Sequence, residues 1–256
     1  MKIYIMTDME CISGNKTAYS SGVVTLDMRR RLTLDTNAAI EGAFKGGALE
    51  VYIRDGHLGN GKNFIRKNID KRAVIDDDRS RWCGCMDKSF DGTVMIGQHA
   101  MAGTAKALMD HTQDSKEWFQ HSLGGKVVGE IGEWAAMAGY FSVPLIMVAG
   151  DRAACIEARK LISGIVTVEV LNATNRSHAN PLPLAEAHRK ITQGVAIAVR
   201  KAKKIKPFKI MYPFESRLIV QRTDIADALA RNPRYRRIDG RTLSKRARTP
   251  LDMFII

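Results

Sequence analysis

The chain contains a series of short apolar runs, each of which ends in polar or charged residues. Three of these runs contain β-branched residues and predict buried strands, at residues 2–7, 49–53 and 93–97. A helical stretch at residues 27–45 lies between the first two runs and ends at two glycines, a pair typical of a C-terminal cap. The order strand, helix, strand predicts a parallel βαβ unit.

The middle of the chain continues this pattern. Residues 117–128 predict a hairpin that turns at Gly124 and Gly125, and an Ala-rich amphipathic helix follows at residues 129–138. The next apolar run, at residues 143–149, predicts another buried strand. Together with the βαβ unit, these elements predict an α/β fold with a mostly parallel sheet flanked by helices.

Beyond about residue 165 the pattern changes to a mixture of strands and helices. The predicted elements are a strand at 165–171, a helix at 184–204, a strand at 217–220 and a short helix at 224–230. We therefore expect a larger α/β domain at residues 1–165 and a smaller, basic α+β domain at residues 166–256.

Two carboxylates follow the first predicted strand directly. Side chains at positions i and i+2 of an extended segment point to the same side, so Asp8 and Glu10 would project together. Neighbouring carboxylates repel each other unless a cation lies between them, which makes this pair a candidate cation site. The alternative is that Asp8 caps a turn and Glu10 is solvated.

The next two predicted strands each lead to a histidine, His57 and His99. The carboxyl ends of parallel strands gather at one edge of an open sheet, where ligands bind, so both would share that edge with the two carboxylates. A lone histidine after a strand is more often a turn residue, but this series of coincidences favours a site. Glu130 lies in the first turn of the helix predicted at 129–138, where the helix dipole alone would favour a carboxylate.

The candidate donor set consists of two imidazoles and three carboxylates, with His111 close by. This set suits a pair of divalent transition ions, zinc first, better than a single structural zinc, which usually recruits thiolates. Two such ions activate a water and polarise a carbonyl or phosphoryl group, so the chemistry implied is hydrolysis. The sequence contains no His-Glu-x-x-His motif, no nucleophile elbow and no Walker loop.

Several motifs around these residues resemble the DppA-like zinc D-aminopeptidases, a family of metallo-aminopeptidases. The motifs are Asp8-Met9-Glu10, Asp55-Gly56-His57, Ile96-Gly97-Gln98-His99-Ala100, Met109-Asp110-His111-Thr112, Val128-Gly129-Glu130-Ile131-Gly132 and the run at residues 143–151. The similarity extends in register from Met1 to about residue 165 and continues more loosely to residue 205.

The resemblance implies an aminopeptidase with two zinc ions per chain. The ligands that it implies are Asp8 as a bridge, Glu10 and His57 at one site, and His99 and Glu130 at the other. His111 matches the catalytic histidine of the family, a role that suits an imidazole near neutral pH. The resemblance also implies an intracellular, ring-shaped homo-oligomer that shelters its sites inside a cavity.

Three features depart from the family pattern. Cys11 stands where the family usually has a glycine after the Asp-Met-Glu triplet, and its thiol is either an additional metal ligand or a small buried hydrophobe. Arg152 follows Gly150-Asp151 where the family often has a second aspartate. The C-terminal part is shorter and more basic than is usual in the family, so substrate preference and assembly are not carried over.

The net charge of +13 is concentrated near the C-terminus. Residues 200–248 contain 16 lysines and arginines against 4 acidic residues, which accounts for +12 of the total. Such a segment is a solvated basic face, a nucleic-acid footprint or a source of potential that steers peptide carboxylates. It has no recognisable nucleic-acid-binding motif and few aromatics for base stacking, so we expect no nucleic-acid partner.

The remaining composition is typical of an ordinary soluble enzyme. With 256 residues the chain can bury a large core in one or two domains. No apolar stretch is long enough to span a membrane, and the first predicted strand begins without a preceding signal peptide. The four cysteines show no pairing framework, which favours a reducing, cytoplasmic compartment: Cys11, Cys83, Cys85 and Cys155.

The leading hypothesis is a dinuclear zinc-dependent aminopeptidase that hydrolyses short peptides, with N-terminal D-amino acids as one option. The alternative among enzymes is a metal-dependent L-aminopeptidase or another amidohydrolase on the same scaffold. The alternative from another class is a basic nucleic-acid-binding or scaffolding protein with a vestigial metal site. The sequence leaves the D or L preference and the preferred side chain open, because it does not identify the residues that line the pocket.

Overall fold

A seven-stranded, mostly parallel sheet forms the centre of the computed structural model, which describes residues 1–19, 23–59 and 61–256. The strands lie in the order β3-β2-β1-β4-β7-β8-β9, and of these described strands β9 alone runs antiparallel to its neighbour. Their bounds are β1 Lys2–Thr7, β2 Glu50–Asp55, β3 Val74–Ile75, β4 Gly92–Gln98, β7 Leu145–Asp151, β8 Val166–Asn175 and β9 His178–Pro181.

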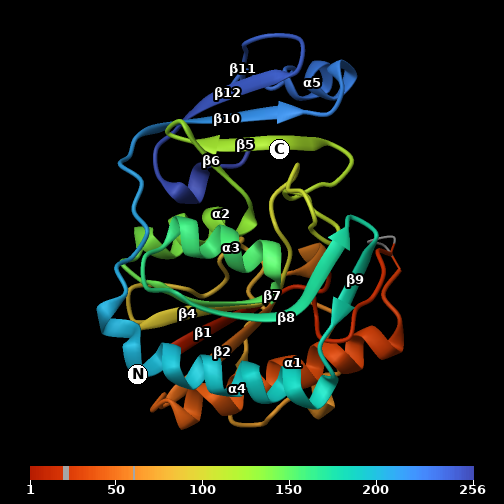
Figure 1. Ribbon diagram of the computed structural model, residues 1–256. Coiled ribbons are helices and arrows are strands. Elements are labelled where there is room, and N and C mark those ends of the chain that lie inside the picture. Colours follow the sequence, from red (N-terminus) through yellow and green to blue (C-terminus); the bar gives the residue numbers. More distant parts are fainter. Residues whose placement is uncertain (20–22, 60) are drawn as a thin grey trace.

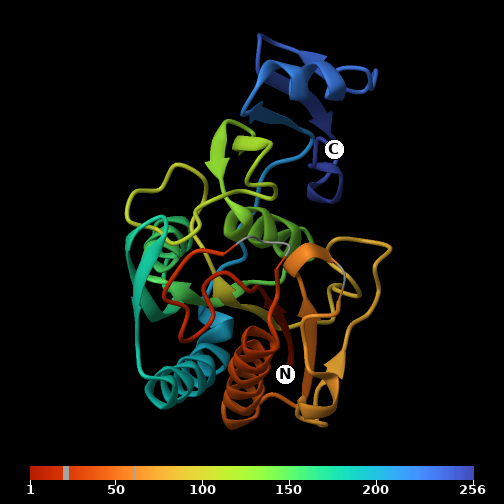
Figure 2. The ribbon, with the colours of Figure 1, turned by 90° about the vertical axis from the view of Figure 1, so that its right-hand side faces the viewer.

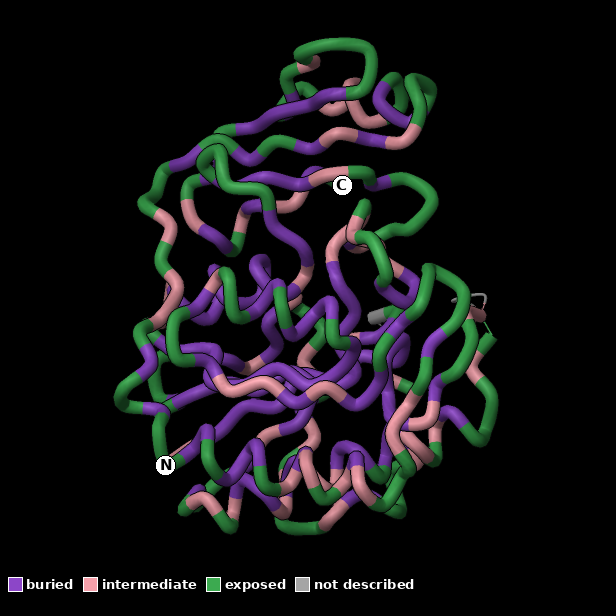
Figure 3. Tube along the Cα trace, viewed as in Figure 1, coloured by how far each residue is buried: buried purple, intermediate pink, exposed green. Residues whose placement is uncertain are grey.

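Helices cover both faces of this sheet (Figure 1). Helices α1 (Leu26–Lys45) and α4 (Leu184–Lys201) pack side by side on one face, and α2 (Glu130–Tyr140) and α3 (Arg152–Leu161) lie on the other. The strands β4 and β7 are therefore buried along their whole length, which explains why they are continuous apolar runs rather than alternating ones. Figure 3 shows the buried residues concentrated along this central layer.

The two helices α1 and α4 approach closely because glycine occupies the contact. A Cβ atom at Gly42 would lie 2.5 Å from the backbone oxygen of Thr192, which no larger residue could tolerate. Helix α1 begins at Thr25, whose side chain accepts a hydrogen bond from the Met28 amide. It ends at the predicted glycine pair, since Gly46 is its C-cap and the next glycine has a φ of +100°.

A second, antiparallel sheet lies beyond α2, at the end of the molecule opposite α1 and α4 (Figures 1 and 2). Its five strands lie in the order β11-β12-β10-β5-β6 and have their own apolar core with the short helix α5. The bounds are β5 Trp118–Leu123, β6 Lys126–Val128, β10 Phe214–Val220, α5 Thr223–Leu229, β11 Arg236–Arg237 and β12 Thr242–Ala247. Short 3₁₀ helices complete the fold: η1 His57–Gly59, η2 Arg66–Asn68, η3 Ala202–Lys204 and η4 Pro250–Asp252.

The α/β fold class, the mostly parallel sheet and the hairpin of β5 and β6 are confirmed. The two sheets are interleaved along the chain, because β5 and β6 precede residue 165 while β8, β9 and α4 follow it. The division into domains at residues 1–165 and 166–256 stays a prediction. Helix α3 and strands β9, β11 and β12 are additional to the predicted elements.

The structure also tests the expectations about membrane-spanning segments and disulfides. Among the described residues, no helix combines the length and apolarity that a membrane span requires. All four cysteines are free thiols, three of them buried. The cytoplasmic location stays a prediction.

Candidate metal centre

The carboxyl edge of the central sheet brings the predicted residues together. Asp8 directly follows β1, His57 begins η1 just after β2, and His99 directly follows β4. Because β1 lies between β2 and β4, the three side chains converge. Glu130 reaches the same place as the first residue of α2.

The donor atoms form two groups. Asp8, Glu10 and His57 make the first, and the ligand atoms of the second group come from His99, His111 and Glu130. Within each group these atoms lie within 4.8 Å of one another. The structure thus assembles all six predicted residues: Asp8, Glu10, His57, His99, His111 and Glu130.

Asp8 connects the two groups. Its Oδ1 atom lies 3.2 Å from His57 Nδ1, which is also 3.2 Å from Glu10 Oε1. Its Oδ2 atom lies 3.5 Å from His99 Nε2. The two oxygens of one carboxylate therefore face different groups, which is the arrangement that a bridging ligand needs.

Charge interactions in the first group are strong because its members are buried. Burial alone would raise the pKa of Asp8, but hydrogen bonds with His57 and His99 hold that pKa well below its usual value. The pKa of Glu10 is raised by burial and by the neighbouring negative charge of Asp8. Burial opposes protonation of His57, yet its contacts with both carboxylates raise its pKa to about 11. The group thus favours positive charge between its carboxylates.

The two imidazoles of the second group are oriented by backbone carbonyls. His99 Nδ1–H donates to the Ala100 oxygen at 3.0 Å, and His111 Nδ1–H donates to the Met109 oxygen at 2.8 Å. The rings stack with centroids 3.9 Å apart and planes 13° apart. Both Nε2 atoms consequently face the carboxylates, as in metal-binding histidines whose other nitrogen is hydrogen-bonded.

Glu130 completes the second group. Its Oε1 atom lies 3.4 Å from His99 Nε2 and 3.7 Å from His111 Nε2. Burial opposes ionisation of Glu130, but the attraction of His99 lowers its pKa, with a smaller contribution from His111. Burial likewise opposes protonation of His99, and the negative charges of Glu130 and Asp8 raise its pKa well above the ordinary value.

The chemistry of these donors fits a pair of zinc ions. The Nε2 atom of His99, which faces Asp8 and Glu130, is buried and makes no hydrogen bond, so it is available to a ligand that the protein does not itself supply. Imidazole nitrogens and carboxylate oxygens are the ligands of catalytic zinc sites. Cys11 joins neither group, because its buried thiol donates instead to the Leu108 carbonyl at 3.7 Å.

Backbone contacts fix the loop that follows β1. Gly97 has a φ of +78°, and a Cβ atom there would lie 2.1 Å from the Asp8 carbonyl oxygen. Only glycine therefore permits this approach, across which the Cys11 amide donates to the Gly97 oxygen at 3.0 Å. The side-chain amide of Asn15 donates to the Glu10 carbonyl at 2.7 Å and holds the end of the loop.

Two further aspartates hold the histidine loops. Asp55, the last residue of β2, accepts from the Asn63 amide at 2.8 Å, and the Asn63 side chain donates to the His57 carbonyl at 3.0 Å. Asp151, the last residue of β7, accepts from the Leu108 amide at 2.9 Å and so anchors the loop that carries His111. Asp55 and Asp151 both belong to motifs on which the family resemblance rests, so those motifs contain residues that hold the ligand loops as well as the ligands.

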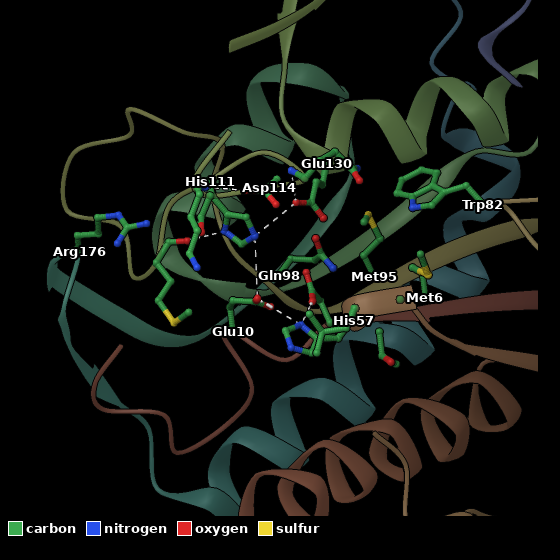
Figure 4. Close-up of a pocket in the computed structure, with 18 residues that line it drawn as sticks. Met6, Glu10, His57, Trp82, Met95, Gln98, His111, Asp114, Glu130 and Arg176 are labelled. Atoms are coloured by element: carbon green, nitrogen blue, oxygen red, sulfur yellow. Dashed lines mark hydrogen bonds and ion pairs between the residues drawn. The ribbon is translucent and has the colours of Figure 1, made fainter. Parts of the chain in front are cut away.

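A cavity of about 410 Å³ opens above the ligands. Met6, Met95 and Trp82 lie on one side of it, and Arg176 lies on the other, as Figure 4 shows. Lys116 also lines the cavity. The sequence did not identify these residues, because nothing in their local pattern marks a lining position. Trp82 in particular lies in a loop without predicted structure.

The basic segment at residues 200–248 contributes nothing to the lining of this cavity. Several of its arginines form ion pairs with nearby carboxylates, such as Arg237 with Asp227 at 3.0 Å and Arg234 with Asp252 at 3.0 Å. This supports a solvated basic face, and the nucleic-acid-binding alternative is not favoured.

Comparisons with known proteins identify the family of this chain. A D-aminopeptidase of Bacillus subtilis (strain 168) is 33% identical over 214 residues, which cover 81% of this chain and 77% of that protein. The solved structure of the Zn-dependent D-aminopeptidase DppA from Bacillus subtilis, described as a self-compartmentalizing protease, matches with a TM-score of 0.92. The match has 28% identity and covers 99% of this chain and 94% of that one.

The family model agrees as well. The model of the peptidase M55 family, described as D-aminopeptidase, matches residues 1–256. The resemblance predicted from the sequence motifs, and with it the class of metallo-aminopeptidases, is confirmed. Since the match spans the whole chain, this protein belongs to the peptidase M55 family of D-aminopeptidases.

Proposed function

We propose that this protein is an aminopeptidase that uses two zinc ions per chain to hydrolyse short peptides with N-terminal D-amino acids. The observation that carries the proposal is the position of Asp8, whose two oxygens face two separate groups of donors at 3.2 and 3.5 Å. Glu10 and His57 would hold one ion with Asp8. His99 and Glu130 would hold the other.

The chemistry that zinc supplies when bound is Lewis-acid catalysis, which activates water and polarises a carbonyl. The chain contributes proton transfer. His111 lines the cavity, and its Nδ1–H donates to the Met109 carbonyl, which turns Nε2 toward the donor groups. We propose that it accepts a proton from the attacking water and delivers it to the leaving amine, roles that an imidazole can perform near neutral pH.

The preference for D-residues is supported by the family and by the D-aminopeptidase from Bacillus subtilis. The structural relative is a self-compartmentalizing protease, which supports a homo-oligomeric assembly for this chain as well. Rates for matched L- and D-aminoacyl peptides test the first point, and the molecular mass in solution tests the second. Faster hydrolysis of the L-series would favour the L-aminopeptidase alternative.

Metal content is the direct test of the site. Zinc-replete protein, freed of loose metal by gel filtration, is expected to hold about two zinc ions per chain, because each donor group can complete one site. Elemental analysis measures this number. Removal of the metal by a chelator should abolish hydrolysis, and added zinc should restore it. A stoichiometry of one would leave the family intact but refute the two-ion arrangement.

Lys116 provides a test of how substrates are oriented. Lys116 is an exposed residue that lines the cavity, and no hydrogen bond or ion pair of its ammonium is found in the described part of the chain. A peptide with a free carboxylate can use this charge. We expect Lys116→Gln to raise KM for such peptides by about two- to fivefold, the effect of an exposed ion pair, and salt should reduce the difference.

Two comparisons make this test specific. The same peptides with amidated C-termini should show no change in KM with Lys116→Gln. Lys203→Gln removes an equal charge from the basic segment, away from the cavity lining, and should leave both KM values unaltered. If Lys203→Gln has the larger effect, long-range steering by the basic segment explains the attraction better than Lys116 does.

A further inference from the structure

A buried pair of titratable residues lies behind the second group of donors. His121 comes from β5 and Glu133 from α2, one helical turn after Glu130, and both are fully buried. His121 Nδ1 lies 2.5 Å from Glu133 Oε1. Neither residue lines the cavity, and the proposed chemistry does not use either of them.

The neighbours of His121 determine where its protons lie. The Ser216 hydroxyl lies 2.5 Å from the Met253 carbonyl oxygen, so its hydrogen must point to that carbonyl. Ser216 Oγ must then accept the hydrogen bond from His121 Nε2, which is 2.9 Å away. Nε2 therefore carries a hydrogen, and His121 Nδ1 is hydrogen-bonded to Glu133 Oε1. All polar atoms of the imidazole are satisfied by this arrangement.

The second oxygen of Glu133 leads to the donor groups. Its Oε2 atom accepts from the Gln113 side chain at 2.7 Å. The Gln113 backbone amide in turn donates to Glu130 Oε1 at 2.8 Å, and this is the oxygen that faces His99 and His111. Gln113 therefore joins the buried pair to the donor atom of Glu130.

The backbone of Gln113 is in a conformation that needs support. Its φ of +59° lies in the left-handed region, which residues with a side chain adopt rarely and at an energetic cost. His111 lies two residues earlier in the same loop. The hydrogen bond to Glu133 thus holds a strained loop that positions both His111 and the Glu130 carboxylate.

We propose that Gln113, Glu133 and His121 are positioning residues for the second zinc ion. They act through Glu130 and His111. Because His121 is hydrogen-bonded to Ser216 of β10, the second sheet fixes the position of these donor residues. This inference rests on the proposed function, because it assumes that the second group binds zinc. Partners of this kind typically change metal affinity or activity by about 10–100-fold when they are removed.

Gln113→Gly is the most direct test. It removes the side chain that Glu133 holds, keeps the backbone amide that binds Glu130, and suits the positive φ. Gln113 is only partly buried in a loop, so the fold should survive, as thermal unfolding would show. We expect one of the two zinc ions to bind about 10–100-fold more weakly in competition with a chromogenic chelator. At saturating zinc, kcat should fall. Gln113 also lines the cavity, so the loss of zinc affinity, rather than KM, separates the positioning role from a contact with substrate.

A pair of variants at Glu133 separates the effect of its hydrogen bonds from the effect of its charge and packing. In Glu133→Gln the amide oxygen can accept from Gln113 and the amide nitrogen can donate to His121 Nδ1, so the network remains complete. This variant should keep zinc affinity and kcat within about threefold of the unsubstituted protein. Glu133→Ala breaks both hydrogen bonds and should weaken the same zinc ion that Gln113→Gly weakens.

The outcomes are distinguishable from a failure of the proposed function. If the unsubstituted protein binds no zinc and hydrolyses no peptide, the proposed function is wrong. If it binds two zinc ions and Gln113→Gly retains both affinities and kcat, the positioning role is wrong. Equal losses in Glu133→Gln and Glu133→Ala would also overturn the inference, because the hydrogen-bond geometry would then not be the cause.

Discussion

Replacing Asp8 by alanine is expected to remove both zinc ions and to reduce peptide hydrolysis to background. Asp8 Oδ1 lies 3.2 Å from His57 Nδ1 and Oδ2 lies 3.5 Å from His99 Nε2, so one side chain serves both groups. Loss of a direct ligand should exceed the effect of about 10–100-fold that is typical of outer partners. Elemental analysis and kcat, measured on the same preparation, provide the test.

Asp8→Asn is the matched comparison for this experiment. It keeps the shape of the side chain but loses the negative charge, so we expect it to fold and to hold at most one ion tightly. A variant with alanine at position 8 that retains one zinc ion at full affinity would show that Asp8 belongs to a single site. The bridging role would then be wrong, although the other ligands could remain correct.

His111→Ala is expected to keep both zinc ions and to lose most of the turnover. General acid–base groups typically contribute about 10²–10⁴-fold to a rate, and kcat should fall within that range. His178→Ala provides a control, because His178 is exposed and lies outside both donor groups. Zinc content and single-turnover rates at saturating peptide distinguish a chemical defect from a binding defect.

The position of His111 gives this experiment a second possible result. Its Nε2 atom lies 3.7 Å from Glu130 Oε1 and within the second donor group, so it is also placed to be a ligand. A fall to one zinc ion per chain in His111→Ala would assign it to the metal. Full activity of the same variant would refute both roles.

The central part of the site was predictable because it depends on sheet geometry. The ends of parallel strands meet at one edge, so Asp8, His57 and His99 could be placed together from the strands that precede them. The apolar runs that revealed these strands are uninterrupted because both faces of the sheet are covered. The same reasoning did not distinguish a structural from a functional Glu130, since the first turn of a helix favours a carboxylate in either case.

The residues that support the ligands, such as His121, were not predictable because they depend on contacts between segments far apart in the sequence. His121 meets Ser216 only because β5 pairs with β10, and no local pattern reports a contact between residues 95 positions apart. Strand β12 was missed because its sequence, TLSKRA, lacks clear alternation of apolar and polar residues. Helix α3 begins directly after β7, with Asp151 as both the last strand residue and the N-cap, so no separate connecting segment marked its start.

The interleaving of the two sheets determines when the protein can become active during its synthesis. Strand β5 emerges long before β10, and their pairing must close a loop of 95 residues, at an entropic cost of about 4 kcal/mol. Until then His121 lacks its hydrogen bond to Ser216, and the residues that hold Gln113 are not yet in place. We expect the zinc site to mature last, after the β10 and β12 segments have left the ribosome. A nascent or truncated chain would therefore not hydrolyse peptides, and activity would begin only when the fold is complete.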